Sequence, residues 1–307
     1  ILKYIKYFIP SILAIILMFT YLQGTFYPTI FLLIFSFVII TGDLFIKDDK
    51  LQKFSYPNIL NLSIYINLPI LFILVFFVVS IFSNHLPIWY IDGFKAIFNI
   101  DFIQLKNSFN LIDKISIIID SALFIGALGI VSAHELTHRK KNKFDMFVGN
   151  WLLSFSWDCN FAIEHVYGHH KNVCLPEDPA TAKRGENIYL FIVRATIREH
   201  VDAWKIELSR LKRRSEYKFG TKNKMIVGYA RSLAITLISF LVGGLIGMCM
   251  YLICAFIAKA LLEVINYTEH YGLVRELDKP VYPRHSWNSN SMMSSILLYN
   301  VTRHSAH

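Results

Sequence analysis

The chain has 307 residues, and 54% of them are hydrophobic, which is more than an ordinary soluble domain contains. The formal net charge of +9 points to membrane-protein loops rich in Lys and Arg rather than to nucleic-acid binding. Four cysteines without a CxxC spacing argue against a disulfide framework.

Several apolar runs are long enough to cross a bilayer, which takes about 20 residues each. We expect six transmembrane helices, at residues 9–22, 29–46, 64–82, 115–133, 225–242 and 245–265. Gly243 and Gly244 would supply a tight reversal between the last two. Polar residues interrupt residues 144–224, which we expect to form helices at or just under the membrane surface. The sequence thus predicts an all-α membrane protein with one integral-membrane domain over residues 1–307.

The two ends of the sequence are unusual for a whole protein. The chain starts with Ile1 rather than Met, and it stops at His307 inside a histidine-rich motif. We therefore expect part of both ends to be missing from this chain.

The basic residues indicate how the helices are oriented. With six spans, the basic stretches 3–6, 47–53, 139–143 and 205–224 all fall on one side of the membrane. The uncharged turn at 23–28 and the balanced loop at 83–114 fall on the other side. Because Lys and Arg concentrate in cytoplasmic loops, the basic side is expected to face the cytoplasm. The same argument places the histidine motifs on the cytoplasmic side.

Histidines gather in four short stretches. His165 and His169 are four residues apart and share one face of an α-helix, whereas His170 is turned about 100° further round. One helix could therefore offer imidazoles to two neighbouring metal ions. The other candidate ligands are His134 and His138 (i, i+4), His270, and His304 and His307 (i, i+3). Nearby carboxylates could hold the imidazoles by accepting the second ring N–H, and the candidates are Glu135, Glu164, Asp178 and Glu269.

Other metal functions fit this pattern less well. The His-Glu-x-x-His stretch 134–138 also occurs in zinc metalloproteases, with Glu135 as the base, but such a site needs only one further ligand and leaves most histidines without a role. A metal transporter or metal-binding membrane protein should carry its histidines near mid-membrane rather than at helix ends. Imidazole suits iron, copper and zinc alike, so the spacing predicts a histidine-rich dinuclear site without selecting the metal.

Longer motifs make a family resemblance visible. The four histidine stretches, together with Pro-Glu-Asp-Pro-Ala at 176–180 and His-Ser-Trp-Asn-Ser-Asn at 285–290, resemble those of the membrane-bound alkane 1-monooxygenases. These enzymes belong to the wider fatty-acid desaturase and hydroxylase superfamily. The stretch Asn-Tyr-Thr-Glu-His-Tyr-Gly-Leu at 266–273 is similar to alkane hydroxylases rather than to desaturases. The resemblance extends at least over residues 43–307.

The resemblance implies a di-iron centre, with two Fe ions held by nine histidines. A ninth ligand would follow His307 directly, and the other eight correspond to His134, His138, His165, His169, His170, His270, His304 and His307. His85 and His200 would then not be ligands, and His285 is a candidate for a supporting role behind a ligand.

The implied reaction inserts one oxygen atom of O2 into a terminal C–H bond of a medium- or long-chain alkane, giving a primary alcohol. The chain has no flavin or nicotinamide fingerprint, and the resemblance implies electrons from rubredoxin and its NADH-dependent reductase. A basic cytoplasmic face would suit such an acidic carrier. The alkane would enter from membrane lipid, past candidate channel residues Phe35, Phe37, Phe124 and Leu128. Related fatty-acyl or xylene-type alkylarene hydroxylases and desaturases are the alternative enzymes.

Overall fold

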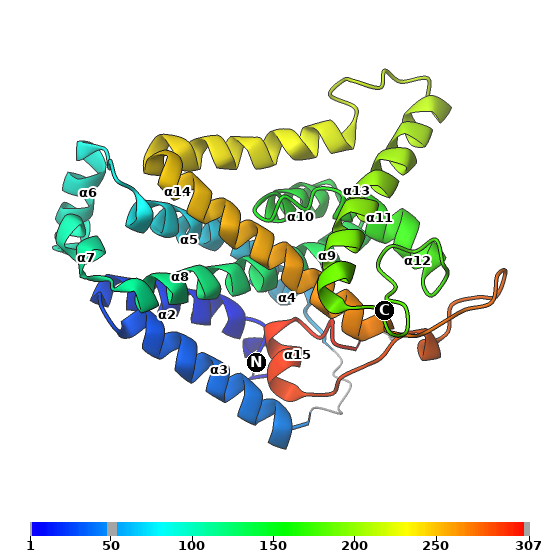
Figure 1. Cartoon of the computed structure of the whole chain (residues 1–307), viewed down its shortest axis with the longest axis horizontal. Helices are drawn as coiled ribbons and strands as arrows, with labels where there is room; N and C mark the ends of the chain where they lie inside the picture. Colours follow the sequence, from blue (N-terminus) through cyan, green and yellow to red (C-terminus); the bar gives the residue numbers. More distant parts are fainter. Residues whose placement is uncertain (1, 48–53, 304–307) are drawn as a thin grey trace.

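The protein is built from helices over residues 2–47 and 54–303, which are the residues that the computed structural model describes (Figure 1). The β contact in these ranges is an isolated bridge between Lys47 and Ser291. The prediction of an all-α protein is confirmed.

The helices of the first half are α1 (Leu2–Ile5), α2 (Ile9–Gln23), α3 (Tyr27–Phe45), α4 (Pro57–Tyr65), α5 (Asn67–Phe82), α6 (Ile88–Phe98), α7 (Phe102–Ser108) and α8 (Leu111–Phe124). A π-helical segment, η1 (Ile125–Val131), then continues α8 directly into α9 (Ser132–His138). The second half contains α10 (Lys143–Ser154), α11 (Phe161–Glu164), the π-helical segment η2 (His165–His169), α12 (His170–Asn172), α13 (Ile188–Arg213), α14 (Lys224–His270), the 3-10 turn η3 (Pro283–His285) and α15 (Met292–Leu297).

Four helical stretches are long and apolar enough to cross a membrane, namely Tyr27–Phe45, Pro57–Phe82, Leu111–His138 and Lys224–His270. α2 is apolar but only 15 residues long. Inside α14 the chain reverses at Gly244, whose φ of 62° and ψ of −164° favour glycine, and Figure 1 shows the two halves folding back on each other. The predicted reversal is therefore confirmed. The number of six spans and the single domain stay predictions.

The spans are apolar on their outer surface as well as between one another. In the core, α14 packs against α5 and α8 over buried residues such as Leu71, Phe124 and Ala255. On α3, by contrast, Phe37 is 67% exposed and Phe45 is 84% exposed. Large exposed apolar surfaces of this kind mark contact with a membrane. Because Phe37 faces outward, its predicted place in a substrate channel is wrong.

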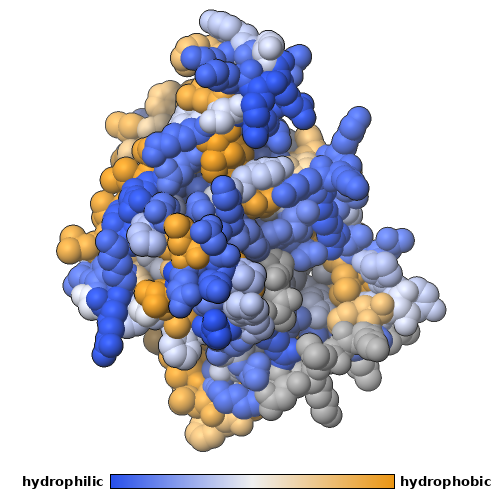
Figure 2. Space-filling model, turned by 90° about the vertical axis from the view of Figure 1, so that its right-hand side faces the viewer, coloured by the Kyte–Doolittle hydropathy of each residue, from blue (hydrophilic) through white to orange (hydrophobic). Residues whose placement is uncertain are grey.

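The two ends of the helix bundle differ. α6 and α7 lie at one end, and α12, the loops around it and one end of α13 lie at the other (Figure 1). Figure 2 shows the surface at this second end to be largely hydrophilic, with hydrophobic residues mostly toward its margins. The described histidine motifs belong to elements at this hydrophilic end.

Candidate metal centre

Four imidazoles from three helical segments converge at the hydrophilic end of the bundle. The side chains of His134, His138, His165 and His170 each offer one nitrogen, and these atoms all lie within 4.8 Å of one another. The Nε2 atoms of His165 and His170 are 3.0 Å apart. His134 and His165 are buried, whereas His138 and His170 are partly exposed. Clustered nitrogen donors without a carboxylate among them fit a transition-metal ion of the kind that imidazole prefers.

A local change of helix type brings two of these ligands together. From His165 to His169 the helix is a π-helix, in which hydrogen bonds join residues five apart. Residues five apart then lie on nearly the same face, so His170 meets His165. The ring of His169 also lies against His165, with centroids 5.3 Å apart, so these two residues share a face as expected and His170 joins them.

His169 also contacts His270 at the end of α14. Their ring centroids are 4.9 Å apart, and both side chains are buried. Asp178 lies 2.9 Å and 3.2 Å, through its two carboxylate oxygens, from His169 Nδ1. His270 Nδ1 lies 3.0 Å from the backbone carbonyl oxygen of His285. Because a carbonyl oxygen can only accept a hydrogen bond, Nδ1 of His270 must be the donor. Because Nδ1 of both rings is engaged behind the site, Nε2 is the atom that each could offer to a metal.

Charge and burial shift the pKa values of His165 and His169 in opposite directions. Burial, together with the neighbouring histidines, keeps the pKa of His165 well below its usual value, so its imidazole is neutral and able to act as a ligand. Burial alone would also lower the pKa of His169, but the adjacent Asp178 carboxylate raises it to about 9. Burial alone would raise the pKa of Asp178. The charge of His169 and the hydrogen bonds from His169 and Thr181 instead keep this pKa below its usual range.

The residues that we expected to hold the imidazole rings make different contacts. Glu135 forms a 2.8 Å ion pair with Arg139, because the two are one turn apart on an exposed helix face, so the structure does not support its expected role behind an imidazole or as a protease base. Glu164 is buried, its Oε1 makes no hydrogen bond within the described part of the chain, and burial raises its pKa to about 8. Glu269 is buried next to His270. His285 acts through its backbone carbonyl, while its own Nδ1 accepts from the Tyr282 N–H at 2.9 Å.

The remaining histidines are placed as follows. His304 and His307 lie outside the described residues. His85 is exposed in the connection between α5 and α6. His200 Nδ1 lies 2.9 Å from the Thr196 carbonyl one turn earlier on α13.

Sequence reasoning missed an aromatic wall beside the imidazoles. The ring of Phe161 stacks on His165 with a centroid separation of 4.4 Å and also lies 5.7 Å from His134. A buried aromatic face against the ligands keeps water from that side of the site.

Sequence reasoning also missed a buried cluster of four charged side chains. Lys259 Nζ lies 3.0 Å from Asp158, 2.7 Å from Glu199 and 2.7 Å from Glu263. All four side chains are buried, and they join α13, α14 and the turn before α11. A lysine and a glutamate four residues apart inside an apolar span were the signal that could have revealed the cluster.

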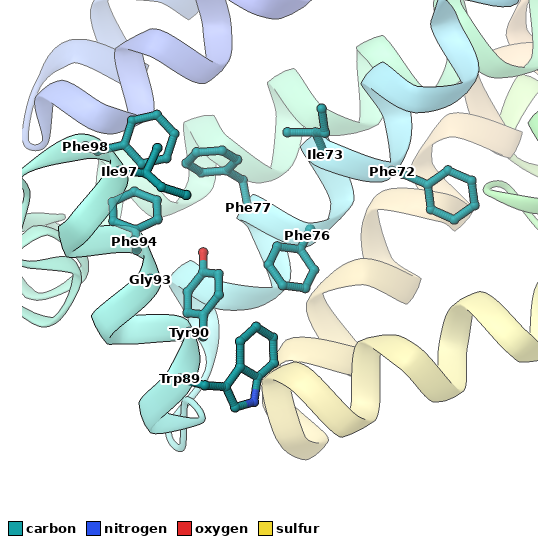
Figure 3. Close-up of a pocket in the computed structure, with 10 residues that line it drawn as sticks. All are labelled: Phe72, Ile73, Phe76, Phe77, Trp89, Tyr90, Gly93, Phe94, Ile97 and Phe98. Atoms are coloured by element: carbon teal, nitrogen blue, oxygen red, sulfur yellow. The ribbon is translucent and has the colours of Figure 1, made fainter.

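An apolar cavity of about 490 Å³ lies between α5 and α6 (Figure 3). Figure 3 shows rings from both helices gathered around it, among them Phe76, Phe77 and Phe94. The other lining residues are Phe72, Ile73, Trp89, Tyr90, Gly93, Ile97 and Phe98.

The fatty acid desaturase family model matches residues 118–307, more than half of the chain and all of the described histidine motifs. The chain belongs to the fatty acid desaturase family. Within this family, the alkane 1-monooxygenase 1 of Pseudomonas aeruginosa is 39% identical over 195 residues, which are 62% of this chain and 51% of the relative.

Two further relatives extend the comparison. The alkane 1-monooxygenase of Acinetobacter baylyi is 35% identical over 231 residues, which are 73% of this chain and 55% of the relative. The hydroxylase component of the xylene/toluene monooxygenase of Pseudomonas putida is 35% identical over 191 residues, which are 62% of this chain and 51% of the relative. This desaturase-family chain thus spans about half the length of the curated relatives it matches.

Proposed function

We propose that the protein is a di-iron monooxygenase of the bacterial inner membrane that hydroxylates the terminal carbon of medium- or long-chain alkanes to primary alcohols. The observation that carries this proposal is the convergence of six histidines in two adjoining groups, in a chain similar to alkane 1-monooxygenases. The histidines belong to the hydrophilic end of the bundle, which we assign to the cytoplasmic side (Figure 2).

The chain would divide its ligands between two iron ions. His134, His138, His165 and His170 would hold one ion. His169 and His270 would contribute to the other, together with His304, His307 and a ninth histidine following directly. Bound iron would supply the redox chemistry that uses O2. Asp178 and the carbonyl of His285 would orient two of the ligand rings, and Phe161 would exclude water.

The apolar interior supports a hydrocarbon substrate. The cavity in Figure 3 has an almost entirely apolar lining, and it lies between α5 and α6. The rings of Phe35 and Phe124 are in tilted contact with centroids 5.7 Å apart, and Leu128 is fully buried. An alkane partitioning from the bilayer would meet only hydrocarbon surface along these residues.

Rubredoxin, reduced by its NADH-dependent reductase, is the electron donor that we propose. Arg139 and Arg210 form ion pairs with Glu135 and Glu207, so attraction of an acidic carrier would rest mainly on the exposed lysines of the same face, such as Lys140, Lys141 and Lys212. If the rate of iron reduction by rubredoxin did not fall with added salt, this docking would be wrong.

A xylene-type alkylarene substrate is the second candidate, favoured by the similarity to the xylene/toluene hydroxylase component. A fatty-acyl hydroxylase or desaturase reaction remains the alternative within the wider family.

The decisive experiment uses membranes containing the full-length protein, supplied with octane, NADH, rubredoxin and its reductase. We expect 1-octanol, detected by gas chromatography, from the native protein and from the surface control His200→Ala, but not from His169→Ala. An iron-containing protein that makes no octanol would point to xylene or acyl substrates. A protein with neither iron nor product would support a metal-binding or transport function instead.

A further inference from the structure

A second, basic cleft of about 420 Å³ lies between α10, α11, η2 and the first half of α14. Four cationic side chains line it, namely Lys140, Lys143, Lys224 and Arg231. Within the described ranges, no carboxylate contributes to this lining. The cleft is therefore built for an anion.

Arg231 is the unusual member of this set. It is two helical turns beyond Lys224, about 10 Å further along α14, and within a candidate membrane span. Its side chain is partly buried, and no carboxylate in residues 2–47 and 54–303 pairs with it. A charged group at such a depth is costly unless it meets a counter-ion.

Part of the remaining lining is apolar, and the surroundings of the cleft resemble a membrane surface. Met146, Ile163 and Val227 contribute hydrocarbon next to the cations. The segments that form the cleft also carry exposed rings, Phe144 and Phe147 on α10 and Phe219 just before Lys224. Exposed aromatic residues beside lysines are typical of the boundary between lipid and water.

We propose that this cleft binds the headgroup phosphate of an anionic phospholipid, with Arg231 and Lys224 contacting the phosphate and the acyl chains following Met146 and Val227. This inference does not depend on the proposed reaction. Thr137 of α9 and Tyr167 of η2 also line the cleft, so a bound lipid would brace two of the three segments that carry His134, His138, His165 and His170.

The test uses the purified full-length protein, stripped of lipid in neutral detergent, with added phosphatidylglycerol. We expect phosphatidylglycerol to raise the Tm by roughly 3 °C and to be retained in native mass spectra. Phosphatidylcholine and inorganic phosphate should not have these effects. In the variant R231Q/K224Q, retention should be about tenfold weaker. The matched control K212Q/R213Q removes the same charge from exposed positions at the end of α13 and should bind as the native protein does.

Several results would overturn the proposal. Equal effects of inorganic phosphate would identify a free-phosphate site, and equal effects of phosphatidylcholine would remove the role of headgroup charge. Unchanged lipid retention in R231Q/K224Q, with a lower rubredoxin-dependent rate, would make the cleft a protein-docking surface. If the double variant does not fold, Lys140→Gln at an exposed position replaces it. We expect this single variant to retain less phosphatidylglycerol than the native protein, with a smaller loss than the double variant would show.

Discussion

Asp178 fixes the orientation of the His169 ring through its contact with Nδ1. Its carboxylate is buried, accepts hydrogen bonds from Thr181 Oγ1 at 2.6 Å and the Ala180 N–H at 3.2 Å, and lies 2.9 Å from His169 Nδ1. An amide has no negative charge, so it would stabilise the Nδ1–H of His169 less than the carboxylate does. We expect Asp178→Asn to weaken metal affinity by about 10–100-fold, measured by competition with a chelator.

Glu135→Gln is the matched control for this change. Glu135 is also an acid beside a ligand in sequence, but it pairs with Arg139 rather than with an imidazole. Equal metal loss in both variants would show that general charge, rather than the contact with His169, controls the affinity.

Lys259 is the other residue whose loss should be severe. Its removal leaves Asp158, Glu199 and Glu263 buried without their cation. We expect Lys259→Met to lower the free energy of unfolding by about 3–5 kcal/mol, measured by denaturation in detergent.

Lys205→Met provides the comparison, since the Lys205 side chain is 70% exposed and its pair with Asp202 contributes little to stability. Similar stability of the two lysine variants would contradict a structural role for the buried cluster.

At the scale of the element, the close crossing of α14 and α5 depends on glycine. A Cβ on Gly243 would lie 2.3 Å from Val79 Cγ1 and 2.9 Å from the Val79 carbonyl oxygen, so the helices would have to separate. We expect Gly243→Ala to lower the Tm in detergent. Gly93→Ala on α6, where a Cβ meets nothing within 4 Å, should leave the Tm unchanged or slightly higher. A neutral Gly243→Ala would mean that this crossing tolerates separation.

The helices and the presence of a histidine cluster could be predicted from sequence, because apolar length and histidine spacing are local properties. The reversal at Gly244 was predictable for the same reason. The partnership of His165 with His170 was not, because it depends on a π-helical turn that α-helical spacing does not describe. The carbonyl of His285 was equally hidden, since every residue has one and only tertiary structure selects it. Two counter-ions of Lys259, Asp158 and Glu199, come from distant segments, which a single sequence does not pair.

For the whole molecule, the two unlike ends of the bundle predict opposite sides of the membrane. Lys95 on α6 and Lys212 in the last turn of α13 are both exposed, and Figure 1 shows α6 at one end of the molecule and the last turn of α13 toward the other. We expect a membrane-impermeant thiol reagent to label Lys95→Cys in intact spheroplasts, and Lys212→Cys only after the membrane is opened. The native protein, whose cysteines are buried except for the partly buried Cys249, serves as the background. Labelling of both positions from outside would contradict the assigned orientation.

The order of synthesis bears on how the two histidine groups are filled. The ribosome releases His134, His138, His165 and His170 well before α14 is made, whereas His270 and the His285 carbonyl that holds it emerge only later. The donors of the first group are thus present in the growing chain while those of the second are still incomplete. A metal ion available at the membrane during translation would meet the first group before the second group is complete. The first group would therefore bind its ion without competition from the second group.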